Sequence, residues 1–218
     1  MNLNEIADKL ALLSTTHFCD ASASIRIFDS AIGNLSNQAR LVGKAFPIEA
    51  NGDLLSIMQA IELANPGDVL VIASNGAQKA LAGEILATAA LKKGIAGMVM
   101  DGYCRDVDAI RALDFPFYAK GIYPAAATKH KLSPLNVPIV CGNIAIHPQD
   151  IIFGDDSGLI AMSYAELIML LPVASEIKAK EVKALDKIQQ GMALGDIFNL
   201  QEYVDELRQQ KSGCLKWL

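Results

Sequence analysis

Residues 68–106 read DVLVIASNGAQKALAGEILATAALKKGIAGMVMDGYCRD, and this stretch decides the fold. The runs 68–73 and 95–101 are apolar and rich in β-branched residues, as expected of buried strands that are covered on both faces. Residues 83–93 between them have helical character. A strand, helix, strand unit of this kind crosses over right-handedly into a parallel pair. The stretch therefore predicts an α/β fold.

The two ends of the central helix are marked by their charges. Glu84 lies in the first turn, while Lys92 and Lys93 lie in the last, which complements the helix dipole at both ends. Gly94 follows at the position that commonly closes a helix. We therefore expect the helix to span residues 83–93.

The flanking segments predict further elements around this unit. A short amphipathic helix is expected over residues 3–13, a strand interrupted by Gly43 over 40–50, and a helix over 54–63 that a turn at 65–67 closes. Short strands bounded by turn residues are expected at 115–119, 138–141, 150–153 and 159–162.

The last quarter of the chain predicts a mostly helical tail over residues 163–218. Ser163 and Glu166 match the capping box S-x-x-E, and Pro172 should kink the helix that follows. We expect this tail to lie at a subunit interface. With no repeat and no low-complexity segment, residues 1–218 should form one domain, because cores stay single up to roughly 250 residues.

Composition excludes several functional classes. The net charge is −5 and no run of Lys and Arg exceeds two residues, so neither nucleic acid nor an anionic membrane is an expected partner. No apolar stretch approaches the roughly 18 residues of a membrane span. The four cysteines are far apart and form no CxxC pair, which favours reduced thiols in the cytoplasm.

The loops that leave the two central strands should form a binding site, because both lie at the carboxyl edge of the sheet. One loop delivers the first turn of the helix at Gly83–Leu86, whose N–H groups lack intrahelical partners. The other delivers Arg105, which can grip a carboxylate bidentately, and Asp106. Asp106 and Glu84 offer the hard oxygen atoms that Mg²⁺ or Mn²⁺ prefers. The pattern predicts a receptor for a small carboxylate and a divalent cation.

Each of these residues also has a purely structural interpretation. An Arg-Asp pair in a loop is more often a solvated surface pair, and Glu84 by itself is more often a first-turn residue that complements the helix dipole. Their shared position relative to the crossover favours the functional interpretation of the set.

The run GDVLVIASNGAQKALAGEILATAALKKGIAGMVMDGYCRDVDAI resembles the 4-hydroxy-4-methyl-2-oxoglutarate aldolase and RraA-like family. The segments DASASIRIF and ARLVGKAFPIEA upstream, and HPQDIIFGDDSGLIAM downstream, resemble it too, so the similarity covers roughly residues 15 to 200. The family motif is an acidic residue, twenty intervening positions and then Arg-Asp, which Glu84 and Arg105-Asp106 match. Glu84 stands where well-studied members have Asp. The resemblance implies a β-rich core of the β/β/α swivelling type.

The resemblance also implies a role for each site residue. Gly83, Glu84, Ile85 and Leu86 would bind the substrate through their backbone, Arg105 through its side chain, and Asp106 would ligate the metal directly. Glu84 would contact the metal through water. An acidic residue from the tail of a neighbouring subunit would complete the site; Glu181 is the candidate and Glu176 the reserve. A homotrimer or hexamer is implied.

The implied activity is that of a class II pyruvate aldolase. With Mg²⁺ or Mn²⁺ as cofactor, such an enzyme cleaves a 4-hydroxy-2-oxo acid resembling 4-hydroxy-4-methyl-2-oxoglutarate to pyruvate, and decarboxylates oxaloacetate. No histidine lies in the motif: His17, His130 and His147 are elsewhere, and we treat them as structural.

Three alternatives remain open. Lys79 lies in a loop where it could form a Schiff base with a 2-oxo acid. Some RraA-like proteins instead inhibit a ribonuclease by protein contact, and a fold does not separate these roles. A methyltransferase activity lacks support, because no G-x-G-x-G turn follows the first strong strand.

Overall fold

The unit predicted over residues 68–101 lies at the centre of the main sheet in the computed structural model, which describes residues 3–38 and 40–218. Strand β4 (Asp68–Ala73) leads through helix α4 (Glu84–Lys93) to strand β6 (Gly97–Cys104), and β4 pairs with β6 in parallel. All six residues of β4 are buried, so the strand is covered on both faces as expected.

Strand β6 starts later and runs further than the sequence predicts. It begins at Gly97 rather than at residue 95 and ends at Cys104 rather than at residue 101. The extension has a partner that the sequence analysis missed: strand β5 (Ala80–Ala82) pairs with Tyr103 and Cys104. As a result, Arg105 and Asp106 follow directly on a strand end.

The main sheet is mixed, with the order β1-β11-β10-β3-β4-β6-β7-β2 and β5 alongside β6. Strands β3, β4, β6 and β7 run parallel to one another, and the outer strands are antiparallel to their neighbours. The remaining strands are β1 (Arg26–Ile27), β2 (Gly33–Asn34), β3 (Leu41–Glu49), β7 (Phe117–Ile122), β10 (Ile151–Asp155) and β11 (Gly158–Met162). A separate hairpin contains β8 (Ile139–Cys141) and β9 (Ile144–Ile146).

The expected interruption at Gly43 is wrong. Gly43 lies inside a continuous β3 and pairs with Ile152 of β10. A Cβ atom at this position would lie only 2.5 Å from the Gly67 carbonyl oxygen, so the glycine permits a close approach of the neighbouring backbone.

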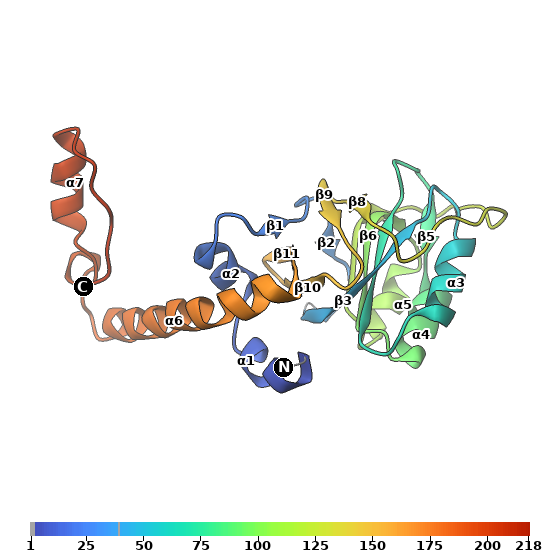
Figure 1. Cartoon of the computed structure of the whole chain (residues 1–218), viewed down its shortest axis with the longest axis horizontal. Coiled ribbons are helices and arrows are strands. Elements are labelled where there is room, and N and C mark those ends of the chain that lie inside the picture. Colours follow the sequence, from blue (N-terminus) through green and yellow to red (C-terminus); the bar gives the residue numbers. More distant parts are fainter. Residues whose placement is uncertain (1–2, 39) are drawn as a thin grey trace.

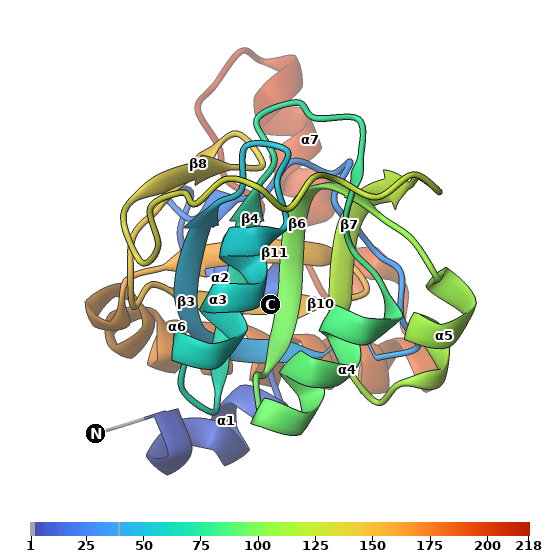
Figure 2. The ribbon, with the colours of Figure 1, turned by 90° about the vertical axis from the view of Figure 1, so that its right-hand side faces the viewer.

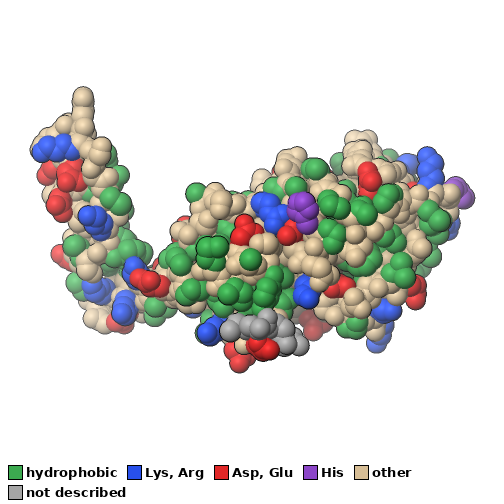
Figure 3. Space-filling model, in the orientation of Figure 1, with side chains coloured by type: hydrophobic (Ala, Val, Ile, Leu, Met, Phe, Trp, Pro, Cys, Tyr) green, Lys and Arg blue, Asp and Glu red, His purple; other side chains and the backbone are tan. Residues whose placement is uncertain are grey.

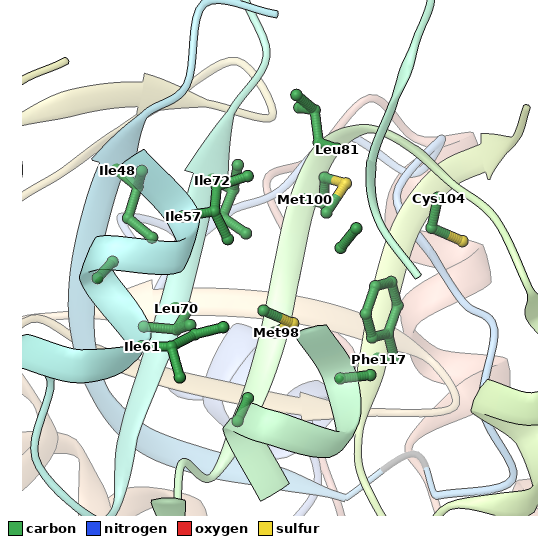
Figure 4. Packing of buried hydrophobic residues seen from close by; sticks show 14 of the residues in the cluster. Ile48, Ile57, Ile61, Leu70, Ile72, Leu81, Met98, Met100, Cys104 and Phe117 are labelled. Carbon is green, nitrogen blue, oxygen red and sulfur yellow. The ribbon is translucent and has the colours of Figure 1, made fainter. Parts of the chain in front are cut away.

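Three helices cover one face of the sheet (Figure 2): α3 (Leu55–Leu63), α4 and α5 (Val107–Ala112). In Figure 4, Ile57 and Ile61 of α3 lie over Ile72 and Leu70 of β4. A second buried cluster on the opposite face joins Val69 and other strand residues to the β8–β9 hairpin. Apolar burial on both faces provides most of the driving force for this fold.

The amino-terminal segment differs from the single helix expected over residues 3–13. A 3₁₀ turn, η1 (Leu3–Ile6), leads into α1 (Ala7–Ala11), and a further helix, α2 (Thr15–Ala21), follows. Helix α2 is held by tertiary bonds that local sequence does not reveal: the backbone N–H and Oγ1 of Thr15 donate to Asp155 at 2.7 and 2.8 Å.

The tail is helical as expected, and its first helix is continuous. The capping box is present: Glu166 N–H donates to Ser163 Oγ at 3.2 Å and Ser163 N–H to Glu166 Oε2 at 2.6 Å. Helix α6 (Tyr164–Gln189) contains Pro172 and continues through it. The 3₁₀ turn η2 (Leu194–Asp196) and α7 (Leu200–Arg208) then extend away from the sheet (Figure 1). Across residues 3–38 and 40–218, each helix is too short or too polar to cross a bilayer.

Candidate active site

The two loops predicted to be neighbours line one cavity of about 240 Å³. Gly83, Ile85 and Leu86 contribute from the start of α4, and Arg105 and Asp106 contribute from the end of β6. The remaining lining residues come from α3, from β5 and from the segment after β7: Leu54, Met58, Ala80, Ala82, Ala126, Ala127 and Lys129. The cavity is thus a mostly apolar hollow with a guanidinium, a carboxylate and an ammonium group.

The loops are tied together by backbone hydrogen bonds. Arg105 N–H donates to the Ala82 carbonyl at 3.0 Å, and Glu84 N–H donates to Asp106 Oδ2 at 3.3 Å. Gly83 permits this approach, because a Cβ atom there would collide with Oδ2 of Asp106 and lie 3.0 Å from Cγ of Arg105. A side chain at Gly83 would therefore push the two loops apart.

The first turn of α4 lies at the cavity, which Gly83, Ile85 and Leu86 line. The first N–H groups of a helix have no intrahelical acceptor, and that of Glu84 is taken by Asp106. The N–H groups of Ile85 and Leu86 come next in this turn. Together with the helix dipole, they favour an anion at this point.

Asp106 adopts a backbone conformation that is uncommon for a residue with a side chain. Its φ and ψ angles are 57° and 39°, in the left-handed region, and it occupies the N-cap position of α5 without a side-chain capping hydrogen bond. The Nε atom of Arg105 lies 3.5 Å from Asp106 Oδ2, and each of the two side chains is 43% exposed. Both charged groups therefore remain accessible to a ligand.

Glu84 and Ile85 are both exposed in the first turn of α4. The Glu84 side chain is exposed and is not among the groups that line the cavity, and Ile85 is 76% exposed at its rim. Leu86 is half-buried and contributes apolar surface. Of the two carboxylates expected to meet a cation, the structure brings Asp106 to the cavity and leaves Glu84 facing solvent beside it.

The sequence analysis missed Lys129. Asp53 fixes its segment: Thr128 Oγ1 donates to Asp53 Oδ2 at 2.6 Å, and His130 N–H donates to the same oxygen at 2.8 Å. Burial alone would raise the pKa of Asp53, but the hydrogen bonds from His130, Thr128 and Leu55 outweigh it and lower the pKa to about 2. These bonds join residues more than seventy positions apart, so no local pattern could have revealed them.

Other polar residues nearby are engaged elsewhere. Asp101 lies inside β6 and accepts from Lys120 Nζ at 2.5 Å and from Gly142 N–H at 3.0 Å. Lys79 does not line the cavity; its Nζ lies 5.8 Å from the ring centre of Tyr123. Burial raises the pKa of the Cys104 thiol to about 11, so it stays protonated at neutral pH.

Glu181 and Glu176 lie on α6, which packs on α2 and the β10–β11 side of the molecule rather than beside α4 (Figure 1). Glu181 Oε2 lies 2.8 Å from His17 Nε2. Glu176 Oε1 lies 2.9 Å from Lys180 Nζ. Neither carboxylate is among the groups lining the cavity of its own chain.

Two hollows that are more than twice as large are poorer candidates. One of about 690 Å³ is lined by Arg40, but the Arg40 guanidinium already donates to the carbonyls of Leu10 and Leu13 and lies over the Phe153 ring. Another of about 830 Å³ between α1 and α6 is lined mostly by apolar residues with lysines at its edge. Neither places a free guanidinium opposite a helix amino terminus.

The donor set at the cavity suits a hard divalent cation. Mg²⁺ takes one or two protein carboxylates and fills its remaining positions with water and substrate oxygens. The accessible Asp106 carboxylate matches that requirement, and the small lining residues beside it leave room for a chelating ligand.

The fold and cavity define the class: a mixed α/β protein whose ligand cavity lies at the carboxyl edge of a parallel βαβ unit. Comparison with known proteins of similar sequence identifies the family. The family model described as RraA-like, Aldolase/RraA, matches residues 15–161. This chain therefore belongs to the RraA-like family.

Individual relatives extend this similarity along most of the chain. A Halalkalibacterium halodurans protein, provisionally named a 4-hydroxy-4-methyl-2-oxoglutarate aldolase, is 33% identical over 197 residues, which cover 89% of this chain and 91% of that protein. An uncharacterised Pseudomonas syringae protein of known structure has a TM-score of 0.79 at 25% identity, covering 88% and 96% of the two chains. Streptomyces coelicolor RraAS2, described as an unusual member of the RNase ES inhibitor RraA family, shares the fold, with a TM-score of 0.71 at 23% identity over 85% and 98%.

Proposed function

We propose that this protein is a divalent-metal-dependent lyase that releases pyruvate from a 4-hydroxy-2-oxo acid such as 4-hydroxy-4-methyl-2-oxoglutarate, and that it also decarboxylates oxaloacetate. The observation that carries the proposal is the shared cavity of the Gly83–Leu86 turn and the Arg105–Asp106 pair. Relatives named as aldolases support the same class of reaction.

Substrate binding would use the first turn of α4 and the Arg105 side chain. The N–H groups of Ile85 and Leu86 would receive the substrate carboxylate, and the Arg105 guanidinium would face its 2-oxo oxygen. Leu54 and Met58 supply apolar walls that limit access of water. Lys129 lies on the same cavity and would attract the second carboxylate of a dicarboxylic substrate.

Both reactions pass through the enolate of pyruvate. In the aldol cleavage, the 4-hydroxyl group loses its proton, the C3–C4 bond breaks and its electron pair moves into the C2–C3 bond and onto the C2 oxygen. In the decarboxylation, carbon dioxide leaves with cleavage of the same bond. A proton added at C3 then gives pyruvate. Arg105 would stabilise the negative charge on the C2 oxygen.

Mg²⁺ or Mn²⁺ bound at Asp106 would supply further electrophilic stabilisation of that oxygen. Glu84, beside this position, would contact the cation through water. Glu181 of a neighbouring subunit would add a carboxylate to the cavity, which requires a homo-oligomer, proposed as a trimer or hexamer. The alternative role as a ribonuclease inhibitor has the family description and fold similarity in its favour, and a fold does not separate the two roles.

The test is pyruvate release from each substrate, followed by reduction with lactate dehydrogenase and NADH, with Mg²⁺ or Mn²⁺ and with EDTA. Arg105→Ala should lower kcat/KM by about 10²–10³-fold, the effect of losing one oxyanion donor. Arg111→Ala removes an identical side chain from α5 outside the cavity and should have no effect. Activity that survives EDTA, together with borohydride trapping of pyruvate on a lysine, would establish a Schiff-base mechanism instead.

A mixture of inactive subunits tests the shared site. If Glu181 acts across the interface, co-assembled Arg105→Ala and Glu181→Ala chains should regain activity, because about a quarter of randomly formed interfaces then pair two intact halves. Failure of the mixture to exceed either variant alone would place Glu181 outside the site.

A further inference from the structure

His17 is a buried histidine whose two ring nitrogens both have partners. Its side chain is 7% exposed on α2. On one side, Nδ1 lies 2.8 Å from the backbone nitrogen of Ser14 and 2.7 Å from Ser14 Oγ. On the other, Nε2 lies 2.8 Å from Oε2 of Glu181.

The Ser14 contact fixes which nitrogen carries the proton. A backbone N–H can only donate, so Nδ1 must accept from Ser14 and the proton of the neutral ring resides on Nε2. Nε2–H therefore donates to the Glu181 carboxylate without any need for a charged imidazole. The ring orientation is fixed as well, because both nitrogens have hydrogen-bond partners.

The helix that carries His17 is itself anchored to the sheet. Thr15, two residues earlier, donates two hydrogen bonds to Asp155 at the end of β10. Helix α2 packs against α6 and β10 within a buried cluster that includes Phe18 and Phe153, whose ring centres are 5.1 Å apart. A continuous path of contacts therefore runs from the sheet through α2 to the carboxylate of Glu181.

Glu181 is held by one oxygen and open at the other. Its side chain is 37% exposed, and among the described residues Oε1 has no hydrogen-bond partner. A glutamate on a solvated helix ordinarily samples several rotamers. Here a buried donor holds one oxygen and leaves the second available to another partner.

We propose that His17 is a positioning residue that presents the Glu181 carboxylate, through its free oxygen, to the Arg105–Asp106 cavity of a second copy of this chain. This inference rests on the proposed function. In metal sites generally, a residue that hydrogen-bonds to a metal ligand fixes the orientation of that ligand. His17 has this role for Glu181. His17 does not touch the substrate.

The experiment compares His17→Leu, His17→Gln, Glu181→Ala and the double variant His17→Leu/Glu181→Ala in the full-length protein. Mn²⁺ affinity is measured by electron paramagnetic resonance, and pyruvate release is measured in parallel. His17→Leu should weaken Mn²⁺ binding by about 10-fold or more, the usual effect of losing such a partner. The side-chain amide nitrogen of Gln can replace Nε2–H as donor, so His17→Gln should restore most of the affinity. His147→Leu, an exposed histidine, is the matched control and should match the wild type.

The double variant separates positioning from general stability. If His17 acts through Glu181, adding His17→Leu to Glu181→Ala should cause no further loss of Mn²⁺ affinity. Additive losses would overturn the inference, as would ¹⁵N NMR shifts of the wild-type ring that place the proton on Nδ1. If His17→Leu binds Mn²⁺ like the wild type while Glu181→Ala is defective, the inference about His17 is wrong and the proposed function stands. Wild-type behaviour of Glu181→Ala would refute the part assigned to Glu181, and the Arg105 test would then judge the cavity separately.

Discussion

At the scale of single residues, the absence of a side chain at Gly83 keeps the cavity assembled. Gly83→Ala would place a methyl group against Oδ2 of Asp106 and separate the loops. We expect a loss of at least about 10-fold in kcat/KM, since misplacement of a binding group by about 1 Å can cost 10²-fold. Gly33→Ala is the control, because a Cβ there meets no neighbouring atom. Equal activity of the two variants would show that the close approach is not needed.

Asp53 links stability to pH through the segment that carries Lys129. Its folded-state pKa of about 2 lies below the ordinary value of 3.8, so the ionised form stabilises the fold. That contribution is fully present above about pH 5 and is lost as the pH falls through 4 toward 2. Asp53→Asn should therefore have a lower midpoint of urea unfolding at pH 7, and the difference from wild type should shrink at pH 3. A difference that stays constant with pH would contradict this account.

At the scale of elements, Gly94 at the carboxyl end of α4 should contribute to stability without contributing to activity. Gly94 adopts φ 83° at the helix end and is distant from the cavity-lining residues. Gly94→Ala should destabilise the protein by about 1 kcal/mol, or lower Tm by about 3 °C, because a side chain is disfavoured in the left-handed region. Gly94→Asn should lose less. Calorimetry measures both effects, and pyruvate release by the two variants at 25 °C should be unchanged.

The elements predicted from sequence are those with strong local patterns. Strand β4 and helix α4 match their expected bounds closely, because apolar runs and end-specific charges are local signals. Strand β5 and helix α2 were missed, since β5 depends on pairing with the end of β6 and α2 on Asp155. The site residues likewise divide into those with local sequence signals and those placed by long-range contacts. Arg105 and Asp106 could be placed from the crossover geometry, whereas Lys129 reaches the cavity only through long-range bonds to Asp53.

At the scale of the whole molecule, the tail carries a stripe of exposed apolar residues on α6. Val182, Leu185 and Ile188 share one stripe of α6 and are 55%, 58% and 42% exposed. Figure 3 shows further apolar side chains gathered over the first half of this helix, whereas the stripe lies in its last third. Exposed apolar patches of this kind mark sites of protein contact. The proposed trimer or hexamer would bury them.

A charge on that stripe should break the assembly. Leu185→Asp would place an unpaired carboxylate in an apolar interface, so sedimentation should shift from a multiple of 23.3 kDa toward the single-chain mass. Gln190→Asp adds the same charge to an exposed position at the end of α6, away from this stripe, and should leave the mass unchanged. A wild-type chain that sediments as a monomer would remove the basis for a site shared between subunits.

The most direct measurement of the central claim is the position of a bound cation in a crystal soaked with Mn²⁺ and oxalate, an analogue of the pyruvate enolate. We expect an anomalous Mn²⁺ peak about 2.2 Å from a carboxylate oxygen of Asp106, with oxalate between Arg105 and the N–H groups of Ile85 and Leu86. Mn²⁺ and oxalate bound away from Asp106 and Arg105 would contradict the account.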